Sequence, residues 1–377
     1  MSELKECRNE IVEIDAQMAS LFEKRMQVCR RIAAYKRENG LPVRDIRTEK
    51  AKIETQKELI RDESVRPYYG LFLQAVMDVS SSYQDMLMEG MRVAYGGTEG
   101  AYAQIAAGRL FPHARLLSRP DFAEAYHCVE TGEADCAVLP IENSIAGEVG
   151  TVMDLMYQGS LFVNEVFALP IRHRLLGLPG SRLDQIRTVV SHPQALGQCS
   201  GYLSAMSCVT ETAENTSAAA RRVKEAGDVS MAAIASEETA EMFGLEILDH
   251  DIQNDGINTT RFAVFSRNRN IPDSGKRRED ENFILVFTVR NEAGALASTL
   301  NIIGAHGYNM RNLKSRPLKS LAWKYYFYLE AEGDIHTQNG KDMLRELSVL
   351  CADLKLVGTF REESREKEED SIHESGI

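Results

Sequence analysis

The chain has 377 residues, of which 44% are hydrophobic and 27% charged, and its formal net charge is −12. This length and composition predict two or three globular domains, and the acidic balance argues against nucleic acid or an anionic membrane as a general partner. No apolar run is long enough to span a bilayer. Seven scattered cysteines without a CxxC pair favour reduced thiols in a cytoplasmic protein over disulfides or zinc.

The first ninety residues predict three helices. Apolar residues recur at helical spacing over residues 4–37, and Asn39-Gly40 then signals a helix end. Two further helices are expected over residues 46–60 and 67–91. Because the long helix needs a partner along its whole apolar stripe, we expect an intertwined homodimer or a higher homo-oligomer.

At residue 92 the pattern changes to short apolar strands that alternate with helical stretches. This is the βαβ pattern of a mostly parallel sheet. The clearest strands are residues 93–95, 137–139, 188–190 and 231–234.

A polar linker over residues 268–281 leads into a second mixed region. Strands at 282–289, 309–315, 323–330 and 354–360, with helices at 295–305 and 340–350, give the βαββαβ order of a small ferredoxin-like α+β domain. The expected divisions are thus an all-α domain (1–91), an α/β domain (92–270), an α+β domain (282–361) and a charged, aromatic-free, disordered tail (362–377).

Three polar segments in the α/β region carry the chemistry. Residues 140–147, 191–198 and 258–262 each adjoin an apolar run that predicts a buried strand. Small polar residues at strand ends in an open α/β sheet are where ligands usually bind. Their hydroxyls, amides, one carboxylate and one arginine suit an anionic, oxygen-rich small molecule, not a metal or a nucleotide.

These segments, with the glycine-rich residues 95–102, resemble prephenate dehydratase in order and spacing, although Ala103 stands where that family usually has serine. The resemblance implies a two-lobed α/β fold similar to type II periplasmic binding proteins, with the active site in the cleft. It also implies decarboxylative dehydration of prephenate to phenylpyruvate, with no cofactor and no metal.

The same resemblance assigns roles to individual residues. Thr260 would donate a hydrogen bond to the departing ring hydroxyl, and Arg261 is a candidate partner for a substrate carboxylate. Other polar residues would fix the substrate: Glu142, Asn143, Ser191 and Gln198. Two structural alternatives stay open, namely turn or capping chemistry for Thr260 and Asn143, and a surface-facing strand position for Arg261.

The three N-terminal helices resemble the helical, AroQ-type chorismate mutase, which rearranges chorismate to prephenate. The likeness lies in Arg8, Arg25, Lys36, Asp45, Glu49, Ser80 and Gln84. Arg25 and Lys36 are eleven residues apart and so about 20° apart around a helix, on one face. Arg8 lies about 100° from Arg25, so the partner's copy would complete the site in a dimer, as the family implies.

The mutase resemblance implies that the protein holds a compact dianionic conformer of the substrate and stabilises the negative charge that develops on its ether oxygen. Arg8 and Arg25 suit the two substrate carboxylates, while Lys36 and Gln84 suit the ether oxygen. Glu49 and Asp45 suit the ring hydroxyl and neighbouring cations, and Ser80 shares a helix face with Gln84. The alternative is a basic, solvated helix face. Thr48 stands where the family usually has arginine.

Two short motifs in the α+β region resemble the phenylalanine-sensing motifs of the ACT domain in bifunctional dehydratases: Gly294, Ala295 and Leu296, then Ser315, Arg316 and Pro317. Lys314 stands where that family normally has glutamate, and the alternative is that Gly294 merely begins a helix. Together the resemblances imply a bifunctional enzyme of phenylalanine biosynthesis, inhibited by L-phenylalanine. Two rival interpretations are a dehydratase with a vestigial, dimerising mutase domain and a non-catalytic amino-acid sensor.

Overall fold

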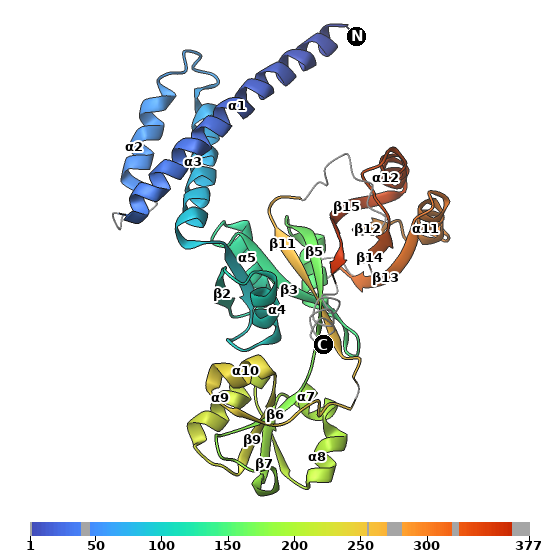
Figure 1. Cartoon of the computed structure of the whole chain (residues 1–377). Helices are drawn as coiled ribbons and strands as arrows, with labels where there is room; N and C mark the ends of the chain where they lie inside the picture. The colour runs from blue at the N-terminus through green and yellow to red at the C-terminus, as the bar shows by residue number, and fades with distance from the viewer. Residues whose placement is uncertain (1, 39–45, 255, 270–280, 319–323, 364–377) are drawn as a thin grey trace, which may run out of the picture. The chain divides into compact units, whose positions relative to one another are not determined.

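The computed structural model describes residues 2–38, 46–254, 256–269, 281–318 and 324–363 (Figure 1). Backbone contacts divide the chain into two units. The first comprises Met1–Arg92 with His113–Arg115, and the second comprises Val93–Pro112 with Leu116–Ile377. Most of the expected linker and almost all of the expected tail lie outside the described residues. No helix in the described ranges is long and apolar enough to cross a membrane.

The first unit consists of the three expected helices, α1 (Ser2–Glu38), α2 (Ile46–Lys57) and α3 (Arg66–Glu89). Proline near the start of α3 fits the first helical turn, whose backbone N–H groups have no intrahelical acceptor. Ile53 of α2 packs with Leu73 and Met77 of α3 in a small buried cluster. This core is small for the apolar surface that the helices carry.

Much of the apolar stripe of α1 is exposed in the single chain. Ile11 is 56% exposed, Leu21 64% and Tyr35 61%. Leu71 on α3 is likewise 72% exposed. Burial of such side chains is worth roughly 1.5–3 kcal/mol each, so the helices retain a strong drive to associate.

The second unit contains two lobes and a C-terminal domain. The sheet of the first lobe has the strand order β5-β11-β3-β1-β2. Its strands are β1 (Arg92–Gly96), β2 (Arg115–Arg119), β3 (Cys136–Asn143), β4 (Gly147–Glu148), β5 (Phe162–Pro170) and β11 (Thr259–Ser266). Its helices are α4 (Tyr102–Leu110), α5 (Phe122–Glu130) and α6 (Gly150–Gln158).

The second lobe has a separate five-stranded sheet in the order β10-β6-β9-β7-β8. Its strands are β6 (Arg174–Gly177), β7 (Thr188–Ser191), β8 (Val209–Thr212), β9 (Met231–Ala235) and β10 (Glu246–Asp249). Its helices are α7 (Pro193–Gln198), α8 (Ser200–Met206), α9 (Thr216–Ala226) and α10 (Glu237–Phe243), with a short 3-10 turn at Leu183–Gln185. Figure 1 shows the chain passing from the first lobe to the second after β5 and returning before β11.

The expectation of a mostly parallel sheet is confirmed only in part, because β1 is parallel to β3 and β7 is parallel to β8 and β9, but both sheets are mixed. In the first lobe β11 runs antiparallel to both β3 and β5, and in the second lobe β6 is antiparallel to β9 and β10. The double crossing explains this, because β11 re-enters the first lobe from the second and must run back between strands that lead towards it.

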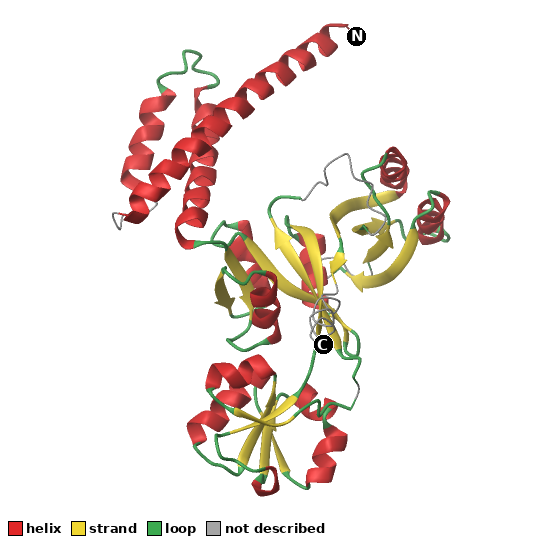
Figure 2. Ribbon diagram, in the orientation of Figure 1, coloured by secondary structure: helices red, strands yellow, loops and turns green. Residues whose placement is uncertain are grey.

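The C-terminal domain confirms the βαββαβ prediction. It comprises β12 (Asn282–Val289), α11 (Ala295–Ala305), β13 (Asn309–Pro317), β14 (Tyr325–Glu332), α12 (Gln338–Leu350) and β15 (Cys351–Phe360), followed by β16 (Glu362–Glu363). The antiparallel order β13-β14-β12-β15 is ferredoxin-like. Both helices lie on one side of the strands (Figure 2).

The C-terminal sheet continues into the sheet of the first lobe. Gly358 of β15 is in register with Val163 of β5, and a Cβ at Gly358 would lie 1.8 Å from the Val163 carbonyl oxygen. Only glycine allows this approach. The face of β12 that does not pack against α11 and α12 contributes Ile284 and Val286 to a buried cluster that also contains residues of α6. The domain is therefore packed against the lobe.

Candidate functional site

Four of the candidate mutase residues lie together on α1 and α3. The Arg25 Nε donates to Ser80 Oγ at 2.9 Å, and the Lys36 Nζ donates to Gln84 Oε1 at 3.3 Å. Ser80 is 3% exposed and Gln84 7%. The structure thus brings two cations and two buried polar side chains onto one seam, as helical spacing predicts.

Arg8 is not part of this seam. Arg8 is exposed and lies seventeen residues before Arg25, or about 26 Å along the helix axis. The position of Asp45 and the side chains of Thr48 and Glu49 lie outside the described residues.

In the first lobe, strand pairing places Thr260 directly opposite Asn143. The Asn143 Nδ2 donates to Thr260 Oγ1 at 2.9 Å and to Asn258 Oδ1 at 2.8 Å. The Asn143 Oδ1 accepts from the backbone N–H groups of Ile145 at 3.0 Å and Ala146 at 2.8 Å. These two backbone donors fix the amide orientation, because only a carbonyl oxygen can accept from them.

The orientation of Asn143 has a chemical consequence for Thr260. The threonine oxygen already accepts a hydrogen bond from Asn143. A hydroxyl that accepts in this way still has its own proton to donate elsewhere. The arrangement therefore presents an oriented O–H donor at the start of β11.

The Glu142 carboxylate points to protein cations. It accepts from Lys314 Nζ at 2.6 Å and from Arg261 Nη1 at 3.3 Å. Although burial acts to raise it, the pKa of Glu142 is held below its ordinary value by Lys314 and Arg261. Arg261 also makes a bidentate pair with Glu330, which is 1% exposed. The structure therefore places Arg261 in an internal ion-pair cluster of β3, β11, β13 and β14.

The two remaining dehydratase candidates lie in the second lobe. Ser191 is fully buried, and its Oγ donates to the Ile234 carbonyl at 2.7 Å, which ties β7 to β9. Gln198 is half-buried at the end of α7, where its Oε1 lies 2.8 Å from His173 Nε2. It lines a pocket of about 450 Å³ together with Asn258, the residue that bonds Asn143.

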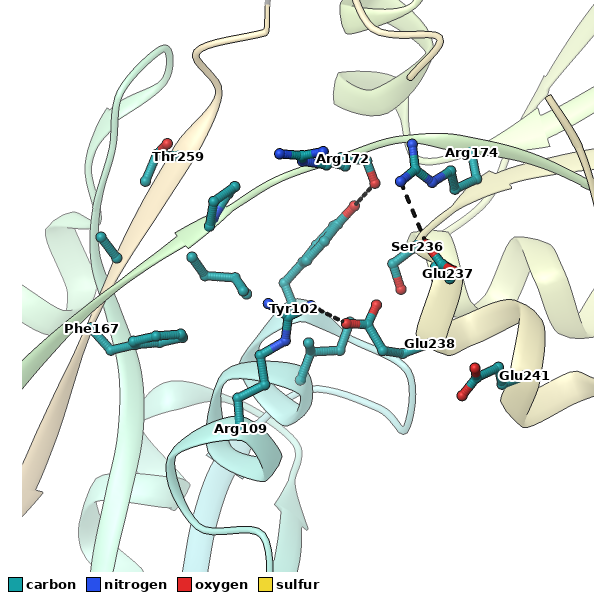
Figure 3. A pocket seen from close by; sticks show the side chains of 14 residues that line it. Tyr102, Arg109, Phe167, Arg172, Arg174, Ser236, Glu237, Glu238, Glu241 and Thr259 are labelled. Atoms are coloured by element: carbon teal, nitrogen blue, oxygen red, sulfur yellow. Dashed lines mark hydrogen bonds and ion pairs between the residues drawn. The ribbon is translucent and has the colours of Figure 1, made fainter. Parts of the chain in front are cut away.

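A larger pocket of about 670 Å³ also opens between the lobes (Figure 3). It is lined by Thr259 instead of Thr260, and by Tyr102, Arg109, Phe167 and Arg172 among others. Consecutive strand residues point to opposite faces, so this pocket and the Thr260 hydroxyl lie on different sides of β11. The oriented donor lies on the Asn143–Thr260 side.

Sequence reasoning did not single out Asn258, Tyr102 or His173, which the structure connects by hydrogen bonds to the candidate residues Asn143 and Gln198. Asn258 and Tyr102 stand within motifs that the sequence already singled out, so their position was a usable signal. His173 follows Pro170 in a segment with no recognisable pattern. The described residues contain no cluster of three or more His, Cys, Asp or Glu side chains arranged to hold a metal ion.

The sensing motifs take two different environments. Gly294 adopts φ +84° at the start of α11, a left-handed conformation that glycine tolerates best, and Ala295 and Leu296 are half-buried behind it. Ser315 and Pro317 are exposed on β13. Arg316 points the other way, where its Nε donates to Asp154 of α6 at 3.2 Å.

Comparison with protein-family models identifies two families that match this chain. The model of the family "Prephenate dehydratase" matches residues 93–270, and that of "Chorismate mutase type II" matches residues 7–85. The chain thus joins a helical mutase region to a two-lobed dehydratase region.

Full-length relatives extend this assignment. The chain is 30% identical to the bifunctional chorismate mutase/prephenate dehydratase of Escherichia coli K12 over 373 residues, covering 95% of this chain and 96% of that protein. It belongs to the bifunctional chorismate mutase/prephenate dehydratase family.

Two solved structures each resemble 72% of this chain. One is prephenate dehydratase from Arthrobacter aurescens in complex with L-Phe, at 26% identity and a TM-score of 0.66 over 72% of this chain and 90% of that chain. The other is GqqA, described as a novel type of quorum-quenching acylase, at 30% identity and a TM-score of 0.67 over 72% of this chain and 98% of that chain.

Proposed function

We propose that this chain catalyses two consecutive steps of phenylalanine biosynthesis. It rearranges chorismate to prephenate, and it converts prephenate to phenylpyruvate, carbon dioxide and water. Family membership over almost the whole chain supports both activities. The observation that carries the second is the Asn143–Thr260 pair, which leaves a hydroxyl proton free for donation.

The dehydratase step needs little more than that donor. The bond between the ring and the carboxylate breaks, its electron pair completes the aromatic ring, and the ring C–O bond breaks with hydroxide leaving as water. A threonine hydroxyl is a weak acid, so Thr260 assists by an oriented hydrogen bond while the proton comes from solvent. Loss of one such donor costs about 3 kcal/mol of transition-state stabilisation.

The mutase step is a unimolecular rearrangement that needs no proton transfer. Arg25 and Lys36 would stabilise the substrate carboxylates and the developing charge on the ether oxygen, with Gln84 assisting. Arg8 lies too far along α1 to reach them in its own chain, so the partner's Arg8 would complete the site. The exposed apolar stripe of α1 supports this homodimer.

L-Phenylalanine would inhibit the enzyme through the C-terminal domain. A similar dehydratase was solved in complex with L-Phe. In this chain β13 carries Ser315 and Pro317 on one face and Lys314 and Arg316 on the other. The basic face contacts Glu142 and Asp154 of the first lobe. Ligand binding on the exposed face would therefore act on a strand that touches the residue next to Asn143.

The proposed setting is the cytoplasm, because all seven cysteines are free thiols and five of them are buried. Neither reaction requires a cofactor or a metal.

One coupled assay tests the proposal against its rivals. Purified protein is supplied with chorismate or prephenate, and prephenate and phenylpyruvate are measured with and without phenylalanine. Both conversions, slowed by phenylalanine, are expected. Consumption of prephenate without consumption of chorismate would support the rival in which the mutase domain is vestigial. Binding of phenylalanine without turnover of either substrate would support the rival of a non-catalytic sensor.

A further inference from the structure

A buried histidine connects two of the motifs that define the dehydratase lobes. His173 is 2% exposed and lies where the chain crosses from β5 to β6. Its Nε2 lies 2.8 Å from Oε1 of Gln198, and its Nδ1 lies 3.3 Å from the hydroxyl of Tyr102. Tyr102 begins α4 directly after the glycine-rich segment. Both ring nitrogens are therefore engaged by side chains from different lobes.

The backbone of His173 is also fixed. Its N–H donates to Gln253 Oε1 at 2.9 Å, and its carbonyl accepts from the Ile252 N–H at 3.2 Å. Gln253 and Ile252 belong to the return crossing before β11. The imidazole is thus held by both crossing segments, and its position does not depend on the two ring contacts alone.

The Gln198 contact is consistent with one of the two neutral tautomers of the ring. With Oε1 of Gln198 as the acceptor, Nε2 carries the hydrogen. The neutral ring then accepts at Nδ1, and the Tyr102 hydroxyl can donate to it. Burial lowers the pKa of His173, although the hydrogen bond to Gln198 acts in the opposite direction. The neutral ring is consistent with this arrangement.

The other tautomer of the ring would reverse which group of the Gln198 amide faces the pocket. Tyr102 also lies 3.2 Å from the Arg172 carbonyl. If its hydroxyl donated there, Nδ1 would carry the hydrogen, Nε2 would accept, and the Gln198 amide would have to turn its carbonyl towards the pocket. The ring tautomer therefore decides whether Gln198 offers the pocket a donor or an acceptor.

We propose that His173 is a positioning residue of the dehydratase, which holds the carbonyl of Gln198 so that its NH₂ group is presented to an anionic substrate. This rests on the proposed dehydratase function. Apart from its ring hydroxyl, prephenate offers two carboxylates and a ketone, all of them acceptors, and the Gln198 NH₂ group would donate to one of these. His173 acts through Gln198 and does not itself contact the substrate.

The test uses the full-length chain and five variants, of which the last two are Gln198→Ala and its double variant with His173→Asn. In His173→Gln the amide reaches the Nε2 position and can still donate to Gln198, whereas in His173→Asn it reaches only the Nδ1 side. We expect His173→Asn to lower kcat/KM for prephenate by on the order of tenfold or more, chiefly through KM. His173→Gln should recover most of that loss. His250→Asn, at an exposed histidine of the same unit, should match the wild type.

A double variant separates positioning from general structural damage. If His173 acts only through Gln198, His173→Asn should cost nothing further in a Gln198→Ala background. Circular dichroism and thermal unfolding, measured on the same samples, show whether the dehydratase lobes of each variant are folded, because the mutase helices belong to a separate unit. Wild-type activity for His173→Asn, or losses that multiply in the double variant, would overturn the proposal. Absence of prephenate turnover in the wild type would instead refute the dehydratase function itself.

Discussion

The two candidate active sites differ in whether a single chain supplies all of their residues. In the helical unit, Arg25, Lys36 and Gln84 line a seam between α1 and α3, but Arg8 lies far along an exposed helix. In the lobes, Thr260 and Asn143 are held by strand pairing and backbone donors within the same chain. Mutase chemistry should therefore depend on a second copy, and the dehydratase donor should not.

The largest expected effect is the loss of the Thr260 hydroxyl. Thr260→Val keeps the side-chain shape and removes the donor, so kcat for prephenate should fall by about 100-fold or more. Thr259→Val is the matched control, because its side chain faces the larger pocket on the other side of β11. Steady-state kinetics with prephenate measure both. Equal losses in the two variants would mean that strand stability, and not the hydroxyl, was removed.

The next largest effect should be confined to the mutase site. Lys36→Ala should lower mutase kcat by about 100-fold, because a cation near developing negative charge is lost, and should leave prephenate turnover unchanged. Lys24→Ala, at an exposed position of the same helix, should leave both activities intact. The two activities are assayed separately. Loss of both in Lys36→Ala, in a folded protein, would contradict two independent sites.

Mixing two inactive mutases tests the need for a second copy. Arg8→Ala and Lys36→Ala should each be inactive alone, whereas hybrid dimers contain one site with both residues intact. After subunit exchange at equal concentrations, about a quarter of wild-type mutase activity should return, because half the dimers are hybrids with one working site. No recovery, despite hybrids seen by native mass spectrometry, would place Arg8 and Lys36 in the same chain's site.

The smallest expected effect concerns the ion pairs that join β13 to the first lobe. Lys314→Met should reduce the free energy of unfolding by about 1 kcal/mol at pH 7. Because the pKa of Glu142 is lowered in the folded state, its contribution is present above the ordinary glutamate pKa and is lost as pH falls through the folded value. Urea titrations should therefore show the variant approaching the wild type in acid. A constant difference across pH would exclude Glu142 as the partner.

The sequence predicted those features that depend on local pattern. Helical spacing located α1 and placed Arg25 and Lys36 on one face, and the βαββαβ order was read from strand and helix periodicity. The motif order also marked Thr260 and Asn143. The direction of β11 was not predictable in this way, because it depends on a crossing between lobes that leaves no local pattern.

The contacts missed are those between residues distant in the chain. Lys314 and Glu142 are 172 positions apart, and Arg261 and Glu142 are 119 apart. Arg261 and Glu142 pair because β11 lies antiparallel to β3. Lys314 reaches Glu142 because the C-terminal sheet joins β5, which requires the close approach at Gly358. His173 was missed for the same reason, since its importance comes from Gln198 and Tyr102 and from nothing in its neighbours along the chain.

The most direct test of the central claim, that the Thr260 hydroxyl drives dehydration, is a single time course from chorismate with Thr260→Ala. Prephenate and phenylpyruvate are followed together by chromatography. The account predicts that chorismate is consumed at the wild-type rate and that prephenate accumulates without conversion. Phenylpyruvate formed at the wild-type rate would contradict it.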